Sequence, residues 1–554
     1  MVKRLVMICN RKYFSIIGFL LGVISFVMVY GVRILNPCFV DWLFGHGDLS
    51  QHYLGWEFYR RAGWYFPIGM TDNLAYPIQT SIIFTDSIPI FAVFFKIWNR
   101  ILPEYFQYFG LWGLICFGLQ GYFSIKIFNN LKLSWISTLA GTVVLIFSPI
   151  IIHRMFMHSS LSAQWLILAS IDMLIQHKKN YKNLKKSIVQ WGILGFLVSG
   201  IHFYFFPMCF LFVAAYVIQS IIEQKKIKYF TPMAAYILGI LFNFWLLGGF
   251  TSSAATNAFG LGNFSFNLNS FFNPRGYSNI LPELGECFSG MQQEGFAYLG
   301  AGVICLLVIC IIMWIVSRII RRERFRIYYS NIVLFGIGIV SIIWALSPIV
   351  TFGDRMLFEL PLPQKIVDLW AVFRSTGRLV WPAYYLIIIY CIKFVAKLRN
   401  PIGMILIVIC TCIQIFDIHG ILNTKHQRFS KNVIYVNNDE NFWKSLTAYR
   451  NFNHLNISYP EERIDYYISL AAIALKYDLT MNGFYFARQI DGARDNTTVL
   501  EREDAKSDSI YVFLPEQVNL MEEHMHELKY YNVSDFVVGV TWLDDAGKVN
   551  DFDY

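Results

Sequence analysis

Eleven apolar runs of spanning length fill the first three quarters of the sequence and constrain its fold more than any other feature. They lie near residues 13–32, 106–125, 134–152, 160–176, 188–201, 203–222, 230–249, 297–317, 329–347, 379–396 and 402–418. A helix of about 20 apolar residues crosses a hydrocarbon core of about 30 Å. The 554 residues are 56% hydrophobic and 15% charged, whereas about 25% of the residues of a soluble domain are charged. The sequence therefore predicts a polytopic α-helical membrane protein with about eleven spans, and it excludes soluble enzymes and single-span receptors.

Charge divides the chain into two parts of opposite sign. Residues 1–419 carry 33 Lys and Arg against 16 Asp and Glu, whereas residues 420–554 carry 13 against 21. We expect a transmembrane domain over 1–419 and a soluble domain over 420–554. The basic residues cluster at the ends of the apolar runs, where membrane topology explains them. The positive charge therefore predicts no nucleic-acid partner.

The basic loops set the orientation in the membrane. The N-terminus and the segments 177–186, 225–228 and 318–326 are rich in Lys and Arg and should face the cytoplasm. The apolar stretch 88–98 is too short to span, and counting it as a span would turn the five-lysine segment 177–186 outward. We expect an interfacial or re-entrant helix there, within a first outer loop over 33–105. The C-terminus then lies outside the cytoplasm.

The soluble part has the pattern of a small α/β domain. Residues 509–514 and 535–543 alternate as strands do, and residues 515–528 between them form an amphipathic helical pattern. This order predicts a β-α-β unit. Residues 464–476 predict a further helix.

The first outer loop holds the densest set of candidate catalytic residues. Asp48, Gln51 and His52 recur at helical spacing, so one face could present a carboxylate, an amide and an imidazole. A carboxylate beside a histidine, just outside the membrane, can act as the general base that deprotonates a sugar hydroxyl. The alternative is that Asp48 caps the helix 49–61, and the two roles are compatible.

Basic side chains on the outer face are candidates for holding a lipid phosphate. Arg154 and His158 lie between two spans, where snorkelling to the headgroups is the alternative. Arg374 and Arg378 are four residues apart, just before a span, and two guanidiniums at that spacing could clamp a phosphate. The positive-inside rule does not call for basic residues on this face, which favours a functional role for the second pair.

Two acidic residues are further candidates for substrate binding. Asp86 precedes Ser-Ile-Pro, a pattern that also fits a helix cap. Glu294 belongs to an acidic, amide-rich lip suited to sugar hydroxyls, although an ordinary solvated loop explains the same residues.

The arrangement resembles the GT-C class of integral-membrane glycosyltransferases, in which a single first span precedes a long outer loop with an early aspartate. More narrowly, five motifs resemble a bacterial family of membrane proteins within that class: Gly47–His52, Trp64–Pro67, Phe84–Pro89, Glu294–Gly300 and Phe373–Arg378. Asp48 matches the class's loop aspartate best, and Asp41 is the alternative. The paired acidic dipeptide common in the class is absent. No cofactor or metal ligand is therefore assigned, and the need for a divalent metal ion stays open.

The resemblance implies an inverting enzyme of the bacterial inner membrane. Its donor would be a polyprenyl-phosphate sugar, and its acceptor a lipid-linked or cell-envelope glycan such as an O-antigen. Asp48 would be the base, with Gln51 or His52 orienting it. Two other functions remain open, a lipid or glycan transporter and a noncatalytic membrane assembly factor.

Overall fold

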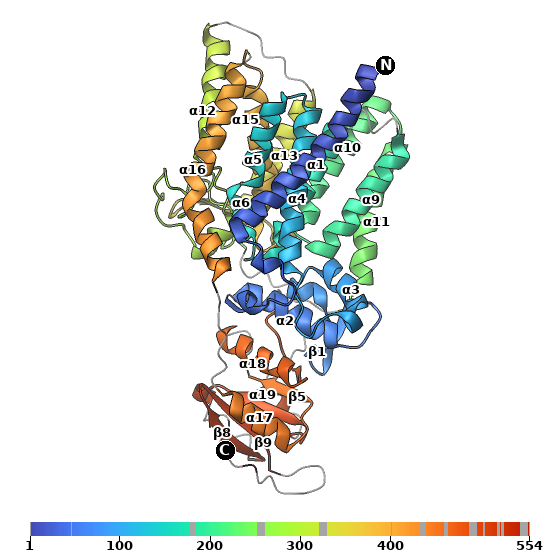
Figure 1. Cartoon of the computed structure of the whole chain (residues 1–554), viewed down its shortest axis with the longest axis vertical. Coiled ribbons are helices and arrows are strands. Elements are labelled where there is room, and N and C mark those ends of the chain that lie inside the picture. Colours follow the sequence, from blue (N-terminus) through green and yellow to red (C-terminus); the bar gives the residue numbers. More distant parts are fainter. Residues whose placement is uncertain are drawn as a thin grey trace.

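The computed structural model describes residues 2–45, 47–176, 183–251, 261–320, 329–399, 401–431, 439–458, 464–486, 496–501, 505–517, 521, 526–542 and 552. Part of the predicted five-lysine segment therefore lies outside the described residues, as does half of the predicted helix 515–528. The chain forms three layers along its long axis: a helical bundle, a layer built from the first outer loop, and the C-terminal domain (Figure 1).

Within the described residues, eight helices are long and apolar enough to cross a membrane. They comprise α1 (Val2–Tyr30), α4 (Phe109–Asn130), the broken pair α5 (Trp135–Ile146) and α6 (Pro149–Arg154), α10 (Phe205–Gln224), α11 (Thr231–Leu246), α12 (Ala301–Ile315), α15 (Trp381–Val395) and α16 (Ile402–Ser430). Three other helices coincide with predicted spans: α7 (Trp165–Ile175), α9 (Leu184–Ile201) and α13 (Tyr329–Leu346). A helical protein with several candidate membrane-spanning helices is therefore confirmed, whereas the count of eleven spans stays a prediction.

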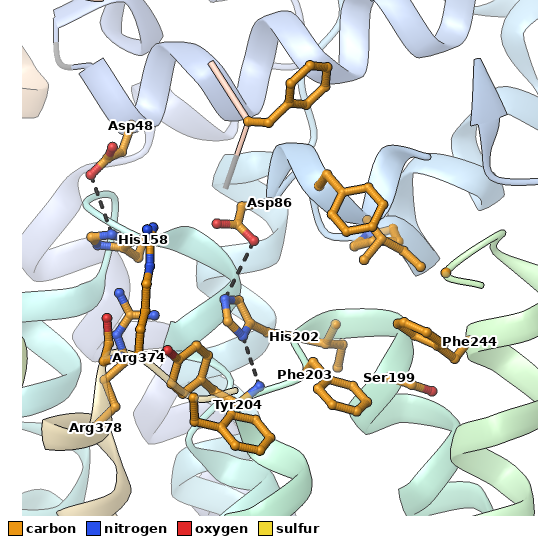
Figure 2. Close-up of a pocket in the computed structure, with 18 of the residues that line it drawn as sticks. Asp48, Asp86, His158, Ser199, His202, Phe203, Tyr204, Phe244, Arg374 and Arg378 are labelled. Carbon is orange, nitrogen blue, oxygen red and sulfur yellow. Dashed lines mark hydrogen bonds and ion pairs between the residues drawn. The ribbon is translucent and has the colours of Figure 1, made fainter. Parts of the chain in front are cut away.

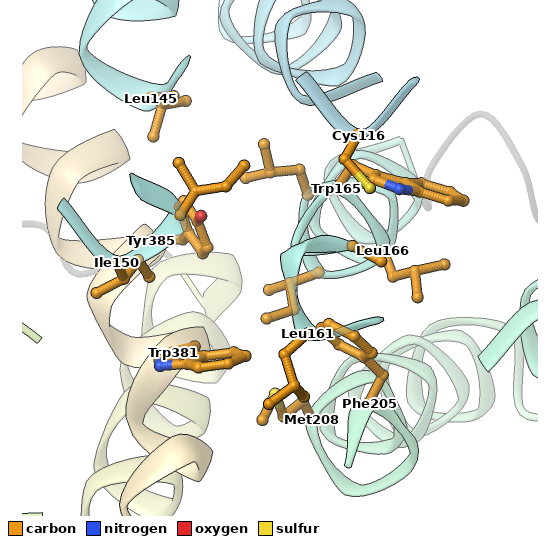
Figure 3. Close-up of a cluster of buried hydrophobic side chains, with 14 of the residues drawn as sticks. Cys116, Leu145, Ile150, Leu161, Trp165, Leu166, Phe205, Met208, Trp381 and Tyr385 are labelled. Carbon is orange, nitrogen blue, oxygen red and sulfur yellow. The ribbon is translucent and has the colours of Figure 1, made fainter. Parts of the chain in front are cut away.

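The bundle helices pack closely where small residues meet. A Cβ atom on Gly18 of α1 would lie 2.4 Å from the carbonyl oxygen of Gly121 of α4, so only glycine permits this helix crossing. Figure 3 shows a deeper part of the core, where Trp381 of α15 faces Leu161 and Phe205 of neighbouring helical segments. All three side chains are fully buried.

A proline break shapes the end of the bundle that faces the outer-loop layer. Ser148 is extended at ψ 131° and Pro149 opens α6, because the residue before a proline avoids helical geometry. Helix α6 ends at Arg154, and a turn leads through His158 into the 3₁₀ segment Ser159–Ser162. This turn brings polar side chains to the end of the bundle that faces the outer-loop layer.

The first outer loop forms short elements between the bundle and the C-terminal domain. They are η1 (Arg33–Leu35), η2 (Asp41–Gly45), α2 (Gly47–Arg61), β1 (Met70–Ala75), β2 (Ile78–Ser81), η3 (Ile82–Thr85), α3 (Pro89–Ile97) and η4 (Asn99–Ile101). Helix α3 has nine residues, too few to cross a bilayer, as expected for the stretch 88–98. A second polar segment contains β3 (Ile349–Phe352), β4 (Arg355–Glu359), α14 (Gln364–Ala371) and η10 (Thr376–Val380).

The C-terminal domain is a five-stranded sheet with helices. Its elements are α17 (Glu440–Tyr449), β5 (His454–Ile457), α18 (Ile464–Lys476), β6 (Thr480–Met481), α19 (Asn496–Leu500), β7 (Ser509–Phe513), β8 (Leu528–Val533) and β9 (Phe536–Thr541). The strand order is β6-β5-β7-β9-β8, with β5 parallel to β6 and β7. The parallel crossover is therefore β5-α18-β6.

The predicted β-α-β unit over 509–543 is wrong. Strand β9 pairs with β7 in the antiparallel direction, and β8 starts at Leu528, where the helix was expected to end. A tight turn with Ser534 in the left-handed region, at φ 49°, joins β8 to β9. The prediction missed this hairpin because it assigned no element to residues 529–534, which form most of β8.

The C-terminal domain shares a hydrophobic core with the outer-loop layer. Leu54 and Phe58 of α2 are buried together with Leu446 and Leu455 of the domain. The backbone N–H of Tyr76 also donates to the carbonyl of Met481 at 2.8 Å. Helix α2 therefore packs against the C-terminal domain through Leu54 and Phe58, and this packing holds the helix in position over the bundle.

Candidate active site

A cavity of about 430 Å³ lies where the three layers meet. Its walls come from α2 and the segment before α3, from the bundle turns near His158 and His202, from residues 372–378, and from the C-terminal domain. Six predicted site residues line it: Asp48, Gln51, Asp86, His158, Arg374 and Arg378. Four do not: Asp41, His52, Arg154 and Glu294. Figure 2 shows Asp48 facing His158 and Asp86 facing His202.

Asp48 lies in the first turn of α2, which begins at Gly47, so it is inside the helix rather than before it. The amide groups of a helix N-terminus favour a negative charge there. Its Oδ2 atom is 3.4 Å from Nε2 of His158. Burial and the nearby Glu294 carboxylate raise the pKa of Asp48, against the opposing effect of Arg378 and Arg154. Asp48 is thus a carboxylate of increased basicity on the cavity wall.

The surroundings of His158 determine which ring nitrogen carries its proton. Burial holds the pKa of His158 well below its usual range, so the ring is neutral. Nδ1 lies 3.4 Å from Nη1 of Arg154, and because a guanidinium can only donate, Nδ1 must accept. The proton is therefore on Nε2, which points at Asp48. His158 orients the carboxylate and has no free lone pair with which to act as a base.

Asp86 and His202 repeat this arrangement on the same cavity. The backbone N–H of Tyr204 donates to Nδ1 of His202 at 3.1 Å, and Nε2 lies 3.5 Å from Oδ1 of Asp86. Burial keeps the pKa of His202 well below its usual range, so the proton of this neutral ring is also on Nε2. Burial raises the pKa of Asp86 to about 6, although Arg378 opposes the shift.

The predicted capping role of Asp86 is wrong. Helix α3 has Ile88 at its N-cap, without a side-chain bond, and the carboxylate of Asp86 faces His202 instead. Asp86 and Ile88 have left-handed backbone angles, with φ of 53° and 55°. For a β-branched residue such as Ile88 this is an outlier, and strain of this kind costs about 1–3 kcal/mol. Ser87, between them, is held by two hydrogen bonds: its Oγ donates to the carbonyl of His52 at 2.6 Å, and the hydroxyl of Tyr108 donates to its carbonyl.

His52 does not share a face with Asp48 and Gln51, contrary to the prediction. Its ring is fully buried against Phe109, with the ring centroids 6.4 Å apart. Burial lowers the pKa of His52 to about 3, so it is neutral. Gln51 and His52 lie on opposite sides of Asp48 and are about 100° apart around the helix, so the face that turns Gln51 to the cavity turns His52 into the core. The imidazole that contacts Asp48 is His158.

Glu294 is not an exposed lip but a buried anion between two arginines. Its Oε2 atom lies 2.8 Å from Nη2 of Arg154 and 2.7 Å from Nε of Arg378. Burial alone would raise the pKa of Glu294, but the two guanidiniums hold it well below its usual range. Arg378 also covers the ring of Tyr204 at 4.7 Å. Glu294 therefore fixes Arg378 at the cavity wall, while Arg374 lines the cavity from a more exposed position.

The C-terminal domain contributes aromatic side chains to the cavity. Tyr485 and Phe486 line it, and Gln51 donates from Nε2 to the carbonyl of Tyr485. Gln51 lies three residues after Asp48, so this bond places the aromatic wall beside the candidate base. Asp41, the alternative base, is an exposed residue at the start of η2 outside this wall.

The residues that line the cavity favour polar chemistry and do not indicate a metal centre. Within the described residues, no group of three or more His, Cys, Asp or Glu side chains could hold a metal ion. The cavity combines two carboxylates that accept hydrogen bonds, two guanidiniums that suit a phosphate, and aromatic rings. It can therefore accept a hydroxyl proton and stabilise a phosphate within one cavity.

Sequence reasoning missed His202, Tyr204 and Tyr485. His202 stands between the predicted apolar runs 188–201 and 203–222, but no motif around it indicates a functional role. Its pairing with Asp86 joins residues more than a hundred positions apart, which no local pattern reveals.

Two family profiles match the chain. One, described as a domain of unknown function (DUF6311), matches residues 19–419, and the other, described as the DUF6311 C-terminal domain, matches residues 442–541. The comparison with curated proteins found no match. Neither family description names an activity, so the resemblance to the GT-C class stays a prediction.

Proposed function

We propose that this chain, which belongs to the DUF6311 family, is an inverting membrane glycosyltransferase that moves a sugar from a polyprenyl-phosphate donor to a glycan at the outer face. The observation that carries the proposal is the cavity in which Asp48, oriented by His158, faces the same space as Arg374 and Arg378. A base and a phosphate-binding pair are the two parts that this reaction requires.

The reaction follows from the placement of these groups. Asp48 accepts the proton of an acceptor hydroxyl on the oxygen that His158 does not contact. The acceptor oxygen forms a bond to C1 of the donor sugar while the bond from C1 to the phosphate oxygen breaks. The polyprenyl phosphate leaves as an anion, which Arg374 and Arg378 stabilise, so no general acid is needed.

The acceptor side of the cavity is assigned to the C-terminal domain. Tyr485 and Phe486 offer aromatic faces beside Asp48, and such rings pack against the apolar faces of sugars. The link from Gln51 to Tyr485 couples the position of this wall to the helix that carries the base. A soluble domain over the site also suits an acceptor that is part of a polymer.

The membrane arrangement belongs to the same proposal. Eleven spans with a cytoplasmic N-terminus place the cavity at the outer face of a bacterial inner membrane, where polyprenyl-phosphate donors are available without ATP or nucleotide sugars. Ser199 and Phe244, near the ends of helices α9 and α11, also line the cavity.

Transfer by the purified protein tests the proposal. The chain is reconstituted in lipid nanodiscs with radiolabelled polyprenyl-phosphate glucose, mannose or galactose and with lipid-linked glycan from the host cell. We expect label in the glycan for one donor, and loss of that sugar from the glycan of cells that lack the chain. An unchanged glycan, together with binding but no transfer, would favour a transporter or an assembly factor.

A further inference from the structure

A second Asp–His pair remains after the proposed reaction has used the first. In both pairs a donor occupies Nδ1 of the histidine, and Nε2 points at an aspartate on the cavity wall. The side chain of His202 is only 10% exposed and that of Asp86 20%. Removing a carboxylate from water in this way costs free energy of desolvation. We therefore expect the second pair to have a function of its own.

The proposed chemistry leaves no proton step for Asp86. A single base suffices, because the phosphate leaves as an anion and needs no proton. An oriented carboxylate that transfers no proton is instead a strong hydrogen-bond acceptor for a hydroxyl. The oxygen of Asp86 opposite His202 is available for that contact.

The position of Asp86 indicates a contact with the donor sugar rather than with the acceptor. Tyr204, whose backbone N–H donates to His202, lies beneath the guanidinium of Arg378, which is 4.7 Å from its ring centroid. The Asp86–His202 pair therefore lies beside a group proposed to hold the donor phosphate. The transferred sugar is bonded directly to that phosphate. The acceptor approaches from Tyr485 and Gln51, on the side of Asp48.

We propose that Asp86, oriented by His202, binds a hydroxyl of the sugar that is transferred, and thereby helps select which polyprenyl-phosphate sugar is used. This inference rests on the proposed function and names its donor-specificity site. The left-handed backbone at Asp86 fits the role, because it turns the carboxylate away from the helix start and into the cavity. His202 is a positioning residue that acts through Asp86.

The test compares two lipids in a binding measurement that needs no turnover. The full-length protein in nanodiscs is titrated with the polyprenyl-phosphate sugar that it transfers, or with glucose, mannose and galactose forms in turn, and with polyprenyl phosphate alone. The ratio of the two dissociation constants isolates the contribution of the sugar. Asp86→Asn is the main variant, since asparagine tolerates the left-handed conformation at φ 53°, so the backbone is retained.

We expect Asp86→Asn to reduce the preference for the sugar-bearing lipid about tenfold, because a neutral amide is a weaker acceptor than a carboxylate. Binding of polyprenyl phosphate alone should not weaken. His202→Ala should act in the same direction, and His202→Gln, which keeps a donor toward Asp86, should restore part of the preference. Asp354→Asn, which changes a carboxylate that is 73% exposed, is the matched control.

The outcomes separate this inference from the function on which it rests. If the wild-type protein binds neither lipid, the proposed function fails and the sugar site with it. If it binds both lipids, and Asp86→Asn leaves the preference intact or weakens both equally, only the sugar site is contradicted. Loss of turnover in Asp86→Asn with unchanged donor preference would make Asp86 the base instead.

Discussion

The chemical role of each side chain in this cavity depends on its neighbours, because they determine its protonation state and its charge. His158 and His202 are held neutral by burial, each with its proton on Nε2. The two aspartates therefore remain the groups that can accept a proton from a substrate. Glu294 neutralises part of the positive charge of Arg154 and Arg378, and in doing so it keeps the pKa of Asp48 raised.

Glu294→Gln should move the pH dependence of transfer. The Glu294 carboxylate raises the pKa of Asp48, whereas Arg154 and Arg378 lower it. Removing that carboxylate therefore lowers the pKa, and since the base works only when ionised, the acidic limb of kcat/KM should shift to lower pH. The variant should also melt earlier, because removing one partner of a buried ion pair costs about 3–5 kcal/mol.

The matched control for this change is Glu283→Gln, an exposed glutamate in the same segment, which should shift neither quantity. A pH–rate profile of Glu294→Gln that coincides with that of the wild type would contradict the electrostatic account of Asp48.

Arg374→Ala and Arg378→Ala should each raise the KM for the donor by about 10- to 100-fold, since each loses charged hydrogen bonds to the phosphate. Lysine should restore more at position 374 than at 378. At position 378 the Nε atom already holds Glu294, and an ammonium cannot contact both Glu294 and the phosphate through a fork. Initial rates at varied donor concentration measure this, and normal saturation in both alanine variants would remove the pair from the site.

The sequence identified six residues of the cavity wall but not their partners. Asp48, Asp86 and Arg378 stood out because a charged side chain near a membrane needs an explanation. Local spacing could not show that Asp48 contacts His158 rather than His52, since contact across the fold depends on packing. It also could not show that Glu294 is buried, because burial there is set by two arginines from distant segments.

At the scale of elements, helix α2 connects the layers. One end presents Asp48 to the cavity, and its buried Leu54 and Phe58 belong to a core shared with the C-terminal domain. Removing that domain would expose this apolar face, so a truncated protein is a poor test of acceptor binding. Changes at Tyr485 or Phe486 address the same question within a folded chain.

Cysteine labelling of two exposed positions should establish the topology. Lys226, between α10 and α11, is expected in the cytoplasm, and Asp354, between β3 and β4, on the outer face. In a background with the exposed Cys38 and Cys412 changed to serine, Asp354→Cys should react with an impermeant maleimide in intact spheroplasts. Lys226→Cys should react only after lysis. Labelling of the Asp354→Cys variant only after lysis would place the cavity on the wrong face for the proposed donor.

The helical elements were easier to predict than the sheet. Each apolar run coincides with a helix, because a long hydrophobic segment has few other ways to satisfy its backbone in lipid. In the C-terminal domain, strand direction depends on pairing between distant segments, and the antiparallel β8–β9 hairpin was missed. The positions of β7 and α18 were nevertheless predicted within a residue or two.

At the scale of the whole molecule, the cavity exists only where the three layers meet. The bundle supplies His158 and His202, the outer-loop layer supplies Asp48 and Asp86, and the C-terminal domain closes one wall with Tyr485. In Figure 1 the outer-loop layer lies between the other two. This arrangement explains how a membrane lipid and a polymeric acceptor could reach one site from different sides.

The most direct measurement of the central claim is sugar transfer by Asp48→Asn beside Asp41→Asn. Asparagine keeps the size and hydrogen-bonding capacity of Asp48 but cannot take up the proton, so kcat should fall by about 10²- to 10⁴-fold while expression and melting temperature stay close to wild type. Asp41→Asn, in the same loop but outside the cavity wall, should keep most of the activity. Full activity of Asp48→Asn would contradict the account, and the reverse pattern would assign the base to Asp41.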